Sequence, residues 1–330
     1  MAQRLRIATF NLEDLGGRSE DDRSLSRRIG ALRPQLDRLT ADVLCLQEVN
    51  AQDLPGHRDR ALISLDRILE GTAYADFHRT VTLGTGGQHF ADKHNLVTLS
   101  RWPITASERI RHDLLPPLTY APVTSGHAAG ERLELQFDRA LLHARVELPD
   151  GRTAHVVNLH LKAPLALPIP GQKMSAFRWK TIPGWAEGFF LAGLKRAGQA
   201  LEARLLVDRL FDSDADALIA VCGDFNAEGR EVPLRILLGD PDDTGNMALS
   251  GRALAALDDL VLPDRRHSVI HAGRRVLLDH ILVSPHLRDA TESLSILNEG
   301  LADEATAGAS NLHPDGSFHA PLVAQFKLPD

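Results

Sequence analysis

Short apolar runs alternate along the chain with segments of helical periodicity. Apolar runs typical of buried strands cover residues 4–10, 42–47, 95–99, 141–148, 153–159, 217–222, 276–283 and 320–326. Apolar residues recur at helical spacing over residues 22–39, and further helices are predicted over 58–69 and 191–211. This alternation predicts an α/β layered fold.

Turn and loop signals refine this picture. Pro149, Asp150 and Gly151 separate two strand-like runs and predict an antiparallel hairpin, so the sheets should be mixed. Residues 84–94, 114–130 and 163–188 have no clear periodicity and are rich in Gly, Pro, His and aromatic residues. Such loops on a rigid scaffold often carry substrate-binding residues.

Composition sets limits on the class of protein. The 330 residues are 43% hydrophobic and 25% charged, which is the ordinary balance of a folded globular protein. We expect one domain over residues 1–330 with a loop-rich insert at 163–188. The net charge of −7 argues against broad, sequence-independent binding of nucleic acid. Two cysteines in strand-like runs make a disulfide framework improbable. We expect no membrane span and a cytoplasmic protein, because no apolar run is long enough and no secretory signal is recognisable.

Polar residues follow several of the apolar runs, in the motifs ATFNLED, LCLQEV, VVNLHL, VCGDFNAE, LLDHILVS and GSFHAP. Glu48 follows a buried strand, where its carboxylate can bind Mg²⁺, and Asn11 and Glu13 can join it. Asp224 and Asn226 follow another buried strand, where a carboxylate can take a proton from water and an amide can donate to developing charge.

The order and content of these motifs resemble the endonuclease/exonuclease/phosphatase superfamily over nearly the whole chain. The resemblance implies a four-layer α/β sandwich, with two mixed β-sheets face to face and helices on the outside. It implies metal binding by Glu48 with Asn11, catalytic roles for Asp224 and Asn226, a phosphate contact from His160, and a pair in which Asp279 orients His319. One departure is Phe318, which stands where the family has Asp; Asp315 could replace that carboxylate if its loop folds back.

Four further residues are candidates for substrate contact. Arg101 and Arg139 match common family positions, although surface ion pairs would explain them equally well. Arg178 and Trp179 lie in the insert at 163–188, which offers stacking and positive charge together. The alternative is that the insert covers the hydrophobic face of the following helix.

The resemblance implies a Mg²⁺-dependent phosphoesterase, with Mn²⁺ as a possible substitute, that hydrolyses a P–O bond by in-line attack of water. We expect a phosphodiesterase or nuclease; a phosphatase or a phospholipid or inositol headgroup phosphoesterase is the alternative, and Phe318 raises a third, a catalytically weak binding module. Either Asp224 or the Asp279–His319 pair could be the base. The sequence leaves open whether the phosphate-ester substrate is a nucleic acid and, if so, whether cleavage is endonucleolytic or exonucleolytic. It also leaves open whether one or two metal ions bind, and the oligomeric state.

Overall fold

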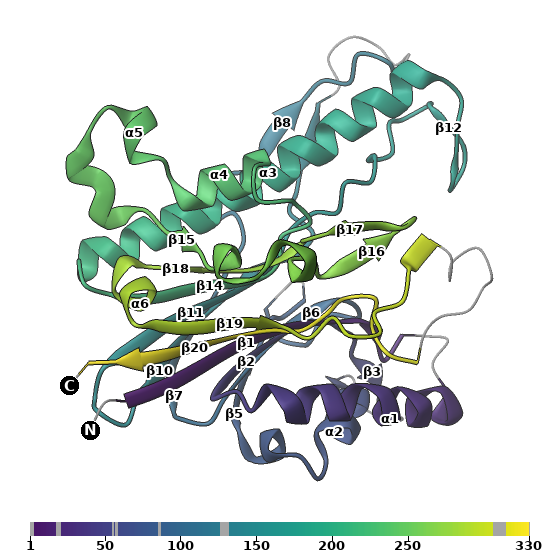
Figure 1. The fold of residues 1–330 in the computed structure, drawn as a ribbon. Helices are drawn as coiled ribbons and strands as arrows, with labels where there is room; N and C mark the ends of the chain where they lie inside the picture. Colours follow the sequence, from purple (N-terminus) through teal and green to yellow (C-terminus); the bar gives the residue numbers. More distant parts are fainter. Residues whose placement is uncertain are drawn as a thin grey trace.

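Two six-stranded sheets form the centre of the molecule (Figure 1). The structure is a computed structural model that describes residues 3–17, 21–54, 56, 59–84, 87–125, 132–305 and 315–329. The first sheet has the order β19-β20-β1-β2-β6-β5 and the second the order β15-β18-β14-β11-β10-β7. Each sheet contains one parallel pair, β1 with β2 and β11 with β14, among antiparallel neighbours, so both sheets are mixed as predicted.

The strands of the first sheet are β1 (Gln3–Leu15), β2 (Val43–Val49), β5 (His78–Val81), β6 (Asn95–Ser100), β19 (Thr291–Ile296) and β20 (Leu322–Leu328). Those of the second are β7 (Ile104–Ile110), β10 (Leu141–Glu147), β11 (Thr153–His160), β14 (Leu218–Asp224), β15 (Ala255–Ala256) and β18 (Asp279–Val283). The antiparallel hairpin predicted around Pro149 is confirmed as β10 and β11.

Helices pack around the two sheets. They are α1 (Asp22–Leu39), α2 (Ile63–Leu69), α3 (Ile182–Ser213), α4 (Val232–Leu238), α5 (Pro241–Thr244) and α6 (Pro285–Asp289). One-turn 3₁₀ segments lie at η1 (Ala73–Asp76), η2 (Met247–Arg252), η3 (Asp258–Leu260) and η4 (Pro263–Arg265). Short two-stranded hairpins pair β3 (Gln52–Asp53) with β4 (Arg60–Ala61), β8 (Leu118–Tyr120) with β9 (Leu133–Leu135), β12 (Lys173–Ser175) with β13 (Arg178–Trp179), and β16 (Val269–His271) with β17 (Arg274–Val276).

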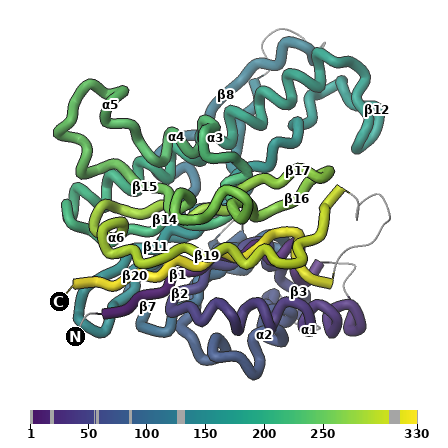
Figure 2. The backbone as a smooth tube through the Cα atoms, in the orientation of Figure 1, coloured from purple at the N-terminus to yellow at the C-terminus, as the bar shows by residue number. Residues whose placement is uncertain are grey.

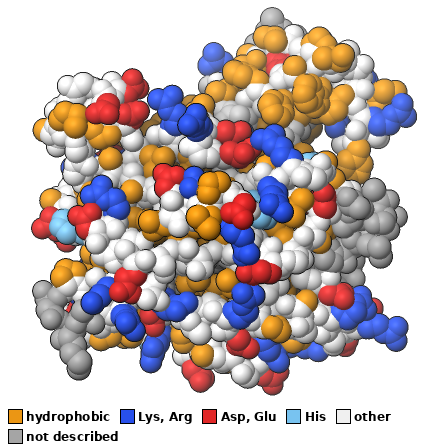
Figure 3. Space-filling view, viewed as in Figure 1, with side chains coloured by type: hydrophobic (Ala, Val, Ile, Leu, Met, Phe, Trp, Pro, Cys, Tyr) orange, Lys and Arg blue, Asp and Glu red, His pale blue; other side chains and the backbone are white. Residues whose placement is uncertain are grey.

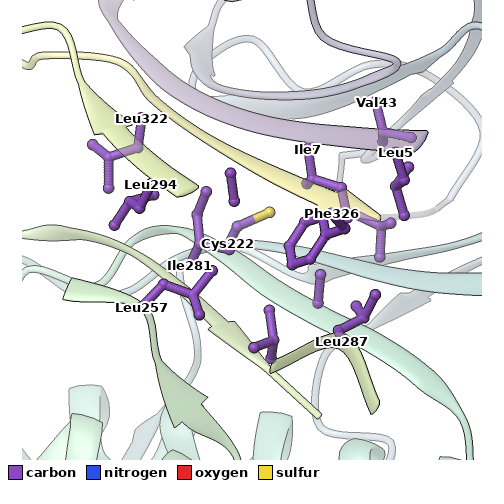
Figure 4. Packing of buried hydrophobic residues seen from close by; sticks show 14 of the residues in the cluster. Leu5, Ile7, Val43, Cys222, Leu257, Ile281, Leu287, Leu294, Leu322 and Phe326 are labelled. Atoms are coloured by element: carbon purple, nitrogen blue, oxygen red, sulfur yellow. The ribbon is translucent and has the colours of Figure 1, made fainter. Parts of the chain in front are cut away.

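Three apolar cores separate four layers, which confirms the predicted sandwich. The central core lies between the sheets and includes Ile7, Cys222 and Phe326 (Figure 4). A second core joins α1 and α2 to the first sheet, and a third joins α3 and α4 to the second. Because successive strand residues face opposite sides, Ile7 belongs to the central core whereas Ala8 belongs to the outer one.

The strands end at two opposite edges of the sandwich. Gln3 pairs with Leu328, so the two ends of the described chain lie together at one edge of the sandwich (Figure 2). The carboxyl ends of β1, β2, β11 and β14 meet at the opposite edge, and β18 begins there because Asp279 pairs with Asp224. Side chains at these strand ends therefore come together.

Three predicted boundaries were wrong. The helix predicted over 58–69 begins at Ile63, because residues 60–61 pair with residues 52–53 as strands. The helix predicted from 191 begins at Ile182, where the Thr181 hydroxyl accepts a hydrogen bond from the Gly184 N–H and caps it, so the end of the loop-rich insert is helical. The strand predicted over 276–283 is divided between β17 and β18.

Within the described part of the chain, no helix is both long enough and apolar enough to cross a membrane.

Candidate active site

The polar residues of the site continue the inward faces of the two sheets. Residues of β14 with the parity of Cys222 face the central core, and Asp224 extends that row. The same parity places His160 at the end of β11 and Asp279 at the start of β18 on this face. His280 lies on the other face of its strand, where its Nδ1 is 2.8 Å from Asp258.

Strand alternation does not explain why Glu48 faces the site. Its parity in β2 is that of Leu44 and Leu46, which belong to the outer core. The backbone of Glu48 has a φ of 59°, in the left-handed region that residues other than Gly rarely adopt, and the pairing of β2 with β6 shifts register between Leu46 and Val49. Such an irregularity re-aims a side chain at a strand end, and here the Glu48 carboxylate faces Asn11.

Backbone strain is concentrated around the site. Eight described residues other than Gly have a positive φ, and five of them lie here: Glu13, Asp14, Glu48, His94 and Asn226. Each such residue costs on the order of 1–3 kcal/mol and persists only where the surrounding contacts enforce it. This concentration is typical of a functional site.

Asn11 connects the two sheets within the site. Its Nδ2 lies 3.2 Å from Glu48 Oε1 and 3.0 Å from Asp224 Oδ2, while its Oδ1 accepts a hydrogen bond from the Glu13 N–H. The Asp14 N–H donates to the other Glu48 oxygen at 3.0 Å. Glu48 and Asp224, from different sheets, are therefore held on either side of one amide.

The GDFN segment, residues 223–226, fixes the position of the Asp224 carboxylate at the end of β14. A Cβ at Gly223, whose φ is 143°, would lie 1.9 Å from the carbonyl oxygen of Leu159, so only Gly fits. The Asn226 N–H donates to Asp224 Oδ1 at 2.8 Å, and the Asn226 side-chain amide donates to the Leu161 carbonyl at 3.1 Å. Both predicted residues lie at the site, with the Asn226 side chain held against the end of β11.

His319 faces Asp224 across the site. Its Nδ1 is 2.8 Å from Asp279 Oδ2, and its Nε2 is 4.0 Å from Asp224 Oδ2. The Ser317 hydroxyl donates to the Asn11 carbonyl and accepts from the His319 N–H, which fixes the loop that carries the imidazole. Asp279 therefore orients His319 so that Nε2 faces the centre of the site.

Burial and charge set the protonation of these groups. Burial raises the pKa of Asp224 to about 7, although the positive charge of His319 opposes this shift. Burial disfavours the charged form of His319, but the carboxylates of Asp279 and Asp224 outweigh it and raise the pKa of His319 to about 10. Burial lowers the pKa of His160 well below its usual value, so its imidazole is neutral. A cationic and a neutral imidazole thus flank one buried carboxylate.

His94 and Arg139 form the side of the site next to Glu48. His94 Nδ1 lies 3.8 Å from Glu48 Oε2 and 2.9 Å from an Arg139 nitrogen, and the second Arg139 nitrogen donates to the His160 carbonyl at 3.5 Å. Asn50 holds His94 by accepting its backbone N–H. Arg139 was predicted as a substrate contact, whereas His94 was not predicted, because its only sequence signal is its place between a Gly-rich loop and a buried strand.

Two groups of side chains have the composition of a metal site. The donor atoms of Glu48, His94 and His160 all lie within 4.8 Å of one another, and so do those of Asp224, Asp279 and His319. Among the described residues, no Lys or Arg forms an ion pair with Glu48, whose carboxylate accepts hydrogen bonds only from neutral amides and is 17% exposed. An accessible carboxylate with no cationic side chain on it fits a divalent cation.

The structure shows what surrounds Phe318, which stands where the family has Asp. The Phe318 side chain is buried, and its backbone N–H donates to Glu13 Oε2 at 2.6 Å. Burial raises the pKa of Glu13. Asp315 does not take the place of the missing carboxylate, because it pairs with Arg27 on the surface with about half of its side chain exposed.

The other predicted substrate contacts lie elsewhere. Arg101 follows β6 at the end where Ser100 pairs with Val43, opposite to Glu48, and its guanidinium is 3.4 Å from Asp42. Trp179 packs against α3 in a small apolar cluster with Ile169 and Leu191, as the alternative of a covering segment predicts. Arg178 is exposed in the β12–β13 hairpin.

Comparisons with known proteins show the family and the fold. The model of the Endonuclease/Exonuclease/phosphatase family matches residues 8–301. No curated protein sequence matches the chain at a significant level.

Similar solved structures show the same fold. Truncated TDP2 of Caenorhabditis elegans has a TM-score of 0.57 at 15% identity, covering 98% of this chain and 97% of that one. A family protein of Bacteroides thetaiotaomicron has a TM-score of 0.59 at 14% identity and covers both chains fully, at 100% each. One of Beutenbergia cavernae has a TM-score of 0.53 at 18% identity, covering 98% of this chain and 72% of that one.

Proposed function

Because the chain belongs to the endonuclease/exonuclease/phosphatase family, whose members are metal-dependent hydrolases of phosphoesters, we propose that it is a Mg²⁺-dependent phosphodiesterase. The observation that carries the proposal is the arrangement around Asn11, whose amide separates Glu48 on one sheet from Asp224 on the other. A metal-facing carboxylate and a candidate base are thereby held a few ångströms apart, as water attack on phosphorus requires.

Glu48 would hold the metal, with Glu13 as a further oxygen donor and the neutral His160 and His94 beside it. Asn11 would contribute by orienting Glu48 through its Nδ2, since its Oδ1 accepts the Glu13 N–H. A bound Mg²⁺ would supply positive charge to a phosphate oxygen, and Mn²⁺ suits a site with nearby imidazoles as well. Glu13 lies next to Phe318, which stands where the family has Asp, because the Glu13 carboxylate accepts a hydrogen bond from the Phe318 N–H.

Asp224 would orient the attacking water and take its proton. Its Oδ2 lies 3.4 Å from His160 Nε2 and 4.0 Å from His319 Nε2, so a phosphate in this space would meet both imidazoles. As the water oxygen bonds to phosphorus and the leaving-group oxygen departs, His319 would donate to the growing negative charge. Asp279 keeps the Nδ1 proton of His319 in place, which leaves Nε2–H for the substrate.

The substrate would be a phosphodiester, and Arg139 would contact its phosphate group. The Arg139 guanidinium donates to the His160 carbonyl and contacts His94, which lies beside Glu48. Nucleic acid is one such ester. A phospholipid or inositol headgroup is the second candidate, favoured by the exposed apolar side chains of the insert at 163–188.

The proposal is tested with bis(p-nitrophenyl) phosphate as a generic phosphodiester and p-nitrophenyl phosphate as a monoester. We expect the diester to be hydrolysed with Mg²⁺ or Mn²⁺, and the rate to disappear with EDTA and return on adding metal. A preference for the monoester would indicate a phosphatase instead. Absence of turnover of either compound, or of nucleic acid and phospholipid diesters, at any metal concentration would identify a binding module and refute the proposal.

A further inference from the structure

A cluster of large apolar side chains projects from the insert, away from every apolar core. Phe177 stands at the turn of the β12–β13 hairpin and is 96% exposed, and Met174 beside it is 60% exposed. Ile182, Trp185 and Phe189 follow at helical spacing on α3, and the last two stack with ring centroids 5.5 Å apart. We call these five residues the apolar tip.

The hairpin and the helix form one continuous surface. Trp179, Ile182 and Trp185 line a common shallow pocket, which joins β13 to the first turn of α3. Figure 3 shows hydrophobic side chains gathered over this part of the molecule, with Lys and Arg side chains at its margin. A contiguous exposed apolar patch rimmed by charged residues is typical of an interaction site.

The charge around the tip is positive although the whole chain carries −7. Lys173, Arg178 and Lys180 belong to the hairpin or follow it directly. Glu187 is the one acidic residue of the sequence from 163 to 190, and it is buried, accepting hydrogen bonds from the Val123 and Thr124 backbone. In the described part of the chain, neither Arg178 nor Lys180 forms an ion pair, so both charges remain available to a partner.

We propose that the apolar tip and its basic residues dock the protein on an anionic phospholipid surface. An apolar apex enters the headgroup region while neighbouring Lys and Arg side chains attract acidic lipids, which is the physical basis of interfacial membrane binding. This goes beyond the proposed function, because it concerns where the protein binds and uses none of the catalytic residues.

The identity of the exposed side chains favours lipid over the other partners. Single-stranded nucleic acid is bound by stacking bases on aromatic faces, but Met174 and Ile182 offer none, and Trp185 and Phe189 stack on each other. Trp179 has such a face, yet it packs against α3 and carries the Lys173 ammonium 4.2 Å above its ring. A second copy of the chain in a symmetric dimer would bring two basic hairpins together, which is unfavourable.

The position of the tip suits action at such a surface. The insert begins directly after β11, whose last residue is His160. The β12–β13 hairpin lies on the same side of the molecule as the ends of β1 and β2 that carry the site (Figure 1). Docking would therefore turn the active-site end of the sandwich toward the membrane.

The experiment is co-sedimentation of the full chain with phosphatidylcholine vesicles, with and without phosphatidylserine. We expect binding to the vesicles that contain phosphatidylserine, weakened by salt. Phe177→Ser and Lys180→Glu should each reduce the bound fraction roughly tenfold. Met247→Ser is the matched control, because Met247 is 63% exposed but lies on η2, outside the tip.

The same variants distinguish loss of membrane docking from loss of folding or of catalysis. Their melting temperatures and their hydrolysis of a soluble phosphodiester should equal those of the unmodified chain, so loss of vesicle binding would be a surface effect. Failure to bind phosphatidylserine vesicles, or equal loss in Met247→Ser, would overturn it. So would a Phe177→Ser variant that binds vesicles normally but loses binding to a single-stranded oligonucleotide, or that dissociates a dimer in sedimentation velocity.

Discussion

Replacing Asp279 with Asn tests whether the Asp279–His319 pair works as an oriented donor. The Asn side chain keeps the shape of the Asp but not its charge, so it removes the principal cause of the raised His319 pKa. The pKa of His319 would then fall, so the imidazole would lose its proton at lower pH and its Nε2 would no longer donate to a phosphate oxygen. Loss of a positioned donor or acid typically lowers kcat by roughly 10²–10⁴-fold.

The same change should also lower stability. Asp279 is 1% exposed and binds His319 at 2.8 Å, so both members of the pair are largely removed from water. Removing one partner of a buried pair costs about 3–5 kcal/mol when the other charge remains. The cost here should lie below that range, because a neutral imidazole can still donate Nδ1–H to the Asn oxygen.

The chain supplies a matched control in Asp258 and His280. This pair is also buried, with the same Nδ1-to-carboxylate distance of 2.8 Å, and His280 also has a raised pKa, since Asp258 outweighs the effect of burial. The imidazole faces away from the site and binds the Ala227 carbonyl. Asp258→Asn should therefore lower stability to a similar extent and leave kcat within a few-fold of the unmodified value.

The assay combines steady-state hydrolysis of bis(p-nitrophenyl) phosphate with urea unfolding of both variants. If Asp279→Asn keeps near-native kcat, the role of the pair as an oriented donor is wrong. If both variants lose the same rate, the effect is structural and the assignment of His319 to catalysis has no support.

Three further predictions concern the metal, the insert and pH. Glu48→Gln should weaken Mg²⁺ binding in calorimetry at least about tenfold at an unchanged melting temperature, since the residue fits a cation and is partly exposed; undiminished Mg²⁺ affinity would remove Glu48 from the metal site. Trp179→Ala should lower the free energy of unfolding by about 2 kcal/mol, roughly half of the loss for a fully buried Trp, with KM unchanged, because the ring packs on α3; a raised KM at constant stability would instead support substrate binding. Burial and the neighbouring positive charge of His143 lower the pKa of His155 to about 4, so the unfolded chain takes up a proton near pH 6.5 while the folded chain does not. The free energy of unfolding should therefore fall as pH decreases from about 6.5 to 4, by up to about 3 kcal/mol, and His155→Gln should flatten this part of the profile measured by urea unfolding; an unaltered profile would show that another group is responsible.

Some parts of the site are local properties of the sequence. Asp224 and His160 end apolar strands with the parity of the core residues before them, so alternation alone predicts that they face inward. By the same rule His280, next to Asp279 in β18, faces the other side of the sheet. The element types were readable for the same reason, since a two-residue or 3.6-residue period is a property of neighbouring residues.

Other features depended on contacts between distant segments. Strand alternation alone would direct Glu48 outward with Leu46, and only the left-handed backbone at the end of β2, enforced by contacts with residues 11–14, turns it inward. Arg101 and Trp179 offered charge and an aromatic face, but pairing of β6 with β2 places the first at the wrong edge, and packing on α3 covers the second.

The sequence by itself therefore determined which side chains stand at strand ends and on which face, because strand periodicity acts over a few residues. Only the tertiary structure decided which of them meet. Asn11 and Asp224 are separated by 213 residues and come within 3.0 Å because two sheets pack face to face, and His94 joins them because the Asn50 side chain fixes its loop. Such contacts arise from the packing of whole layers, which no local pattern encodes.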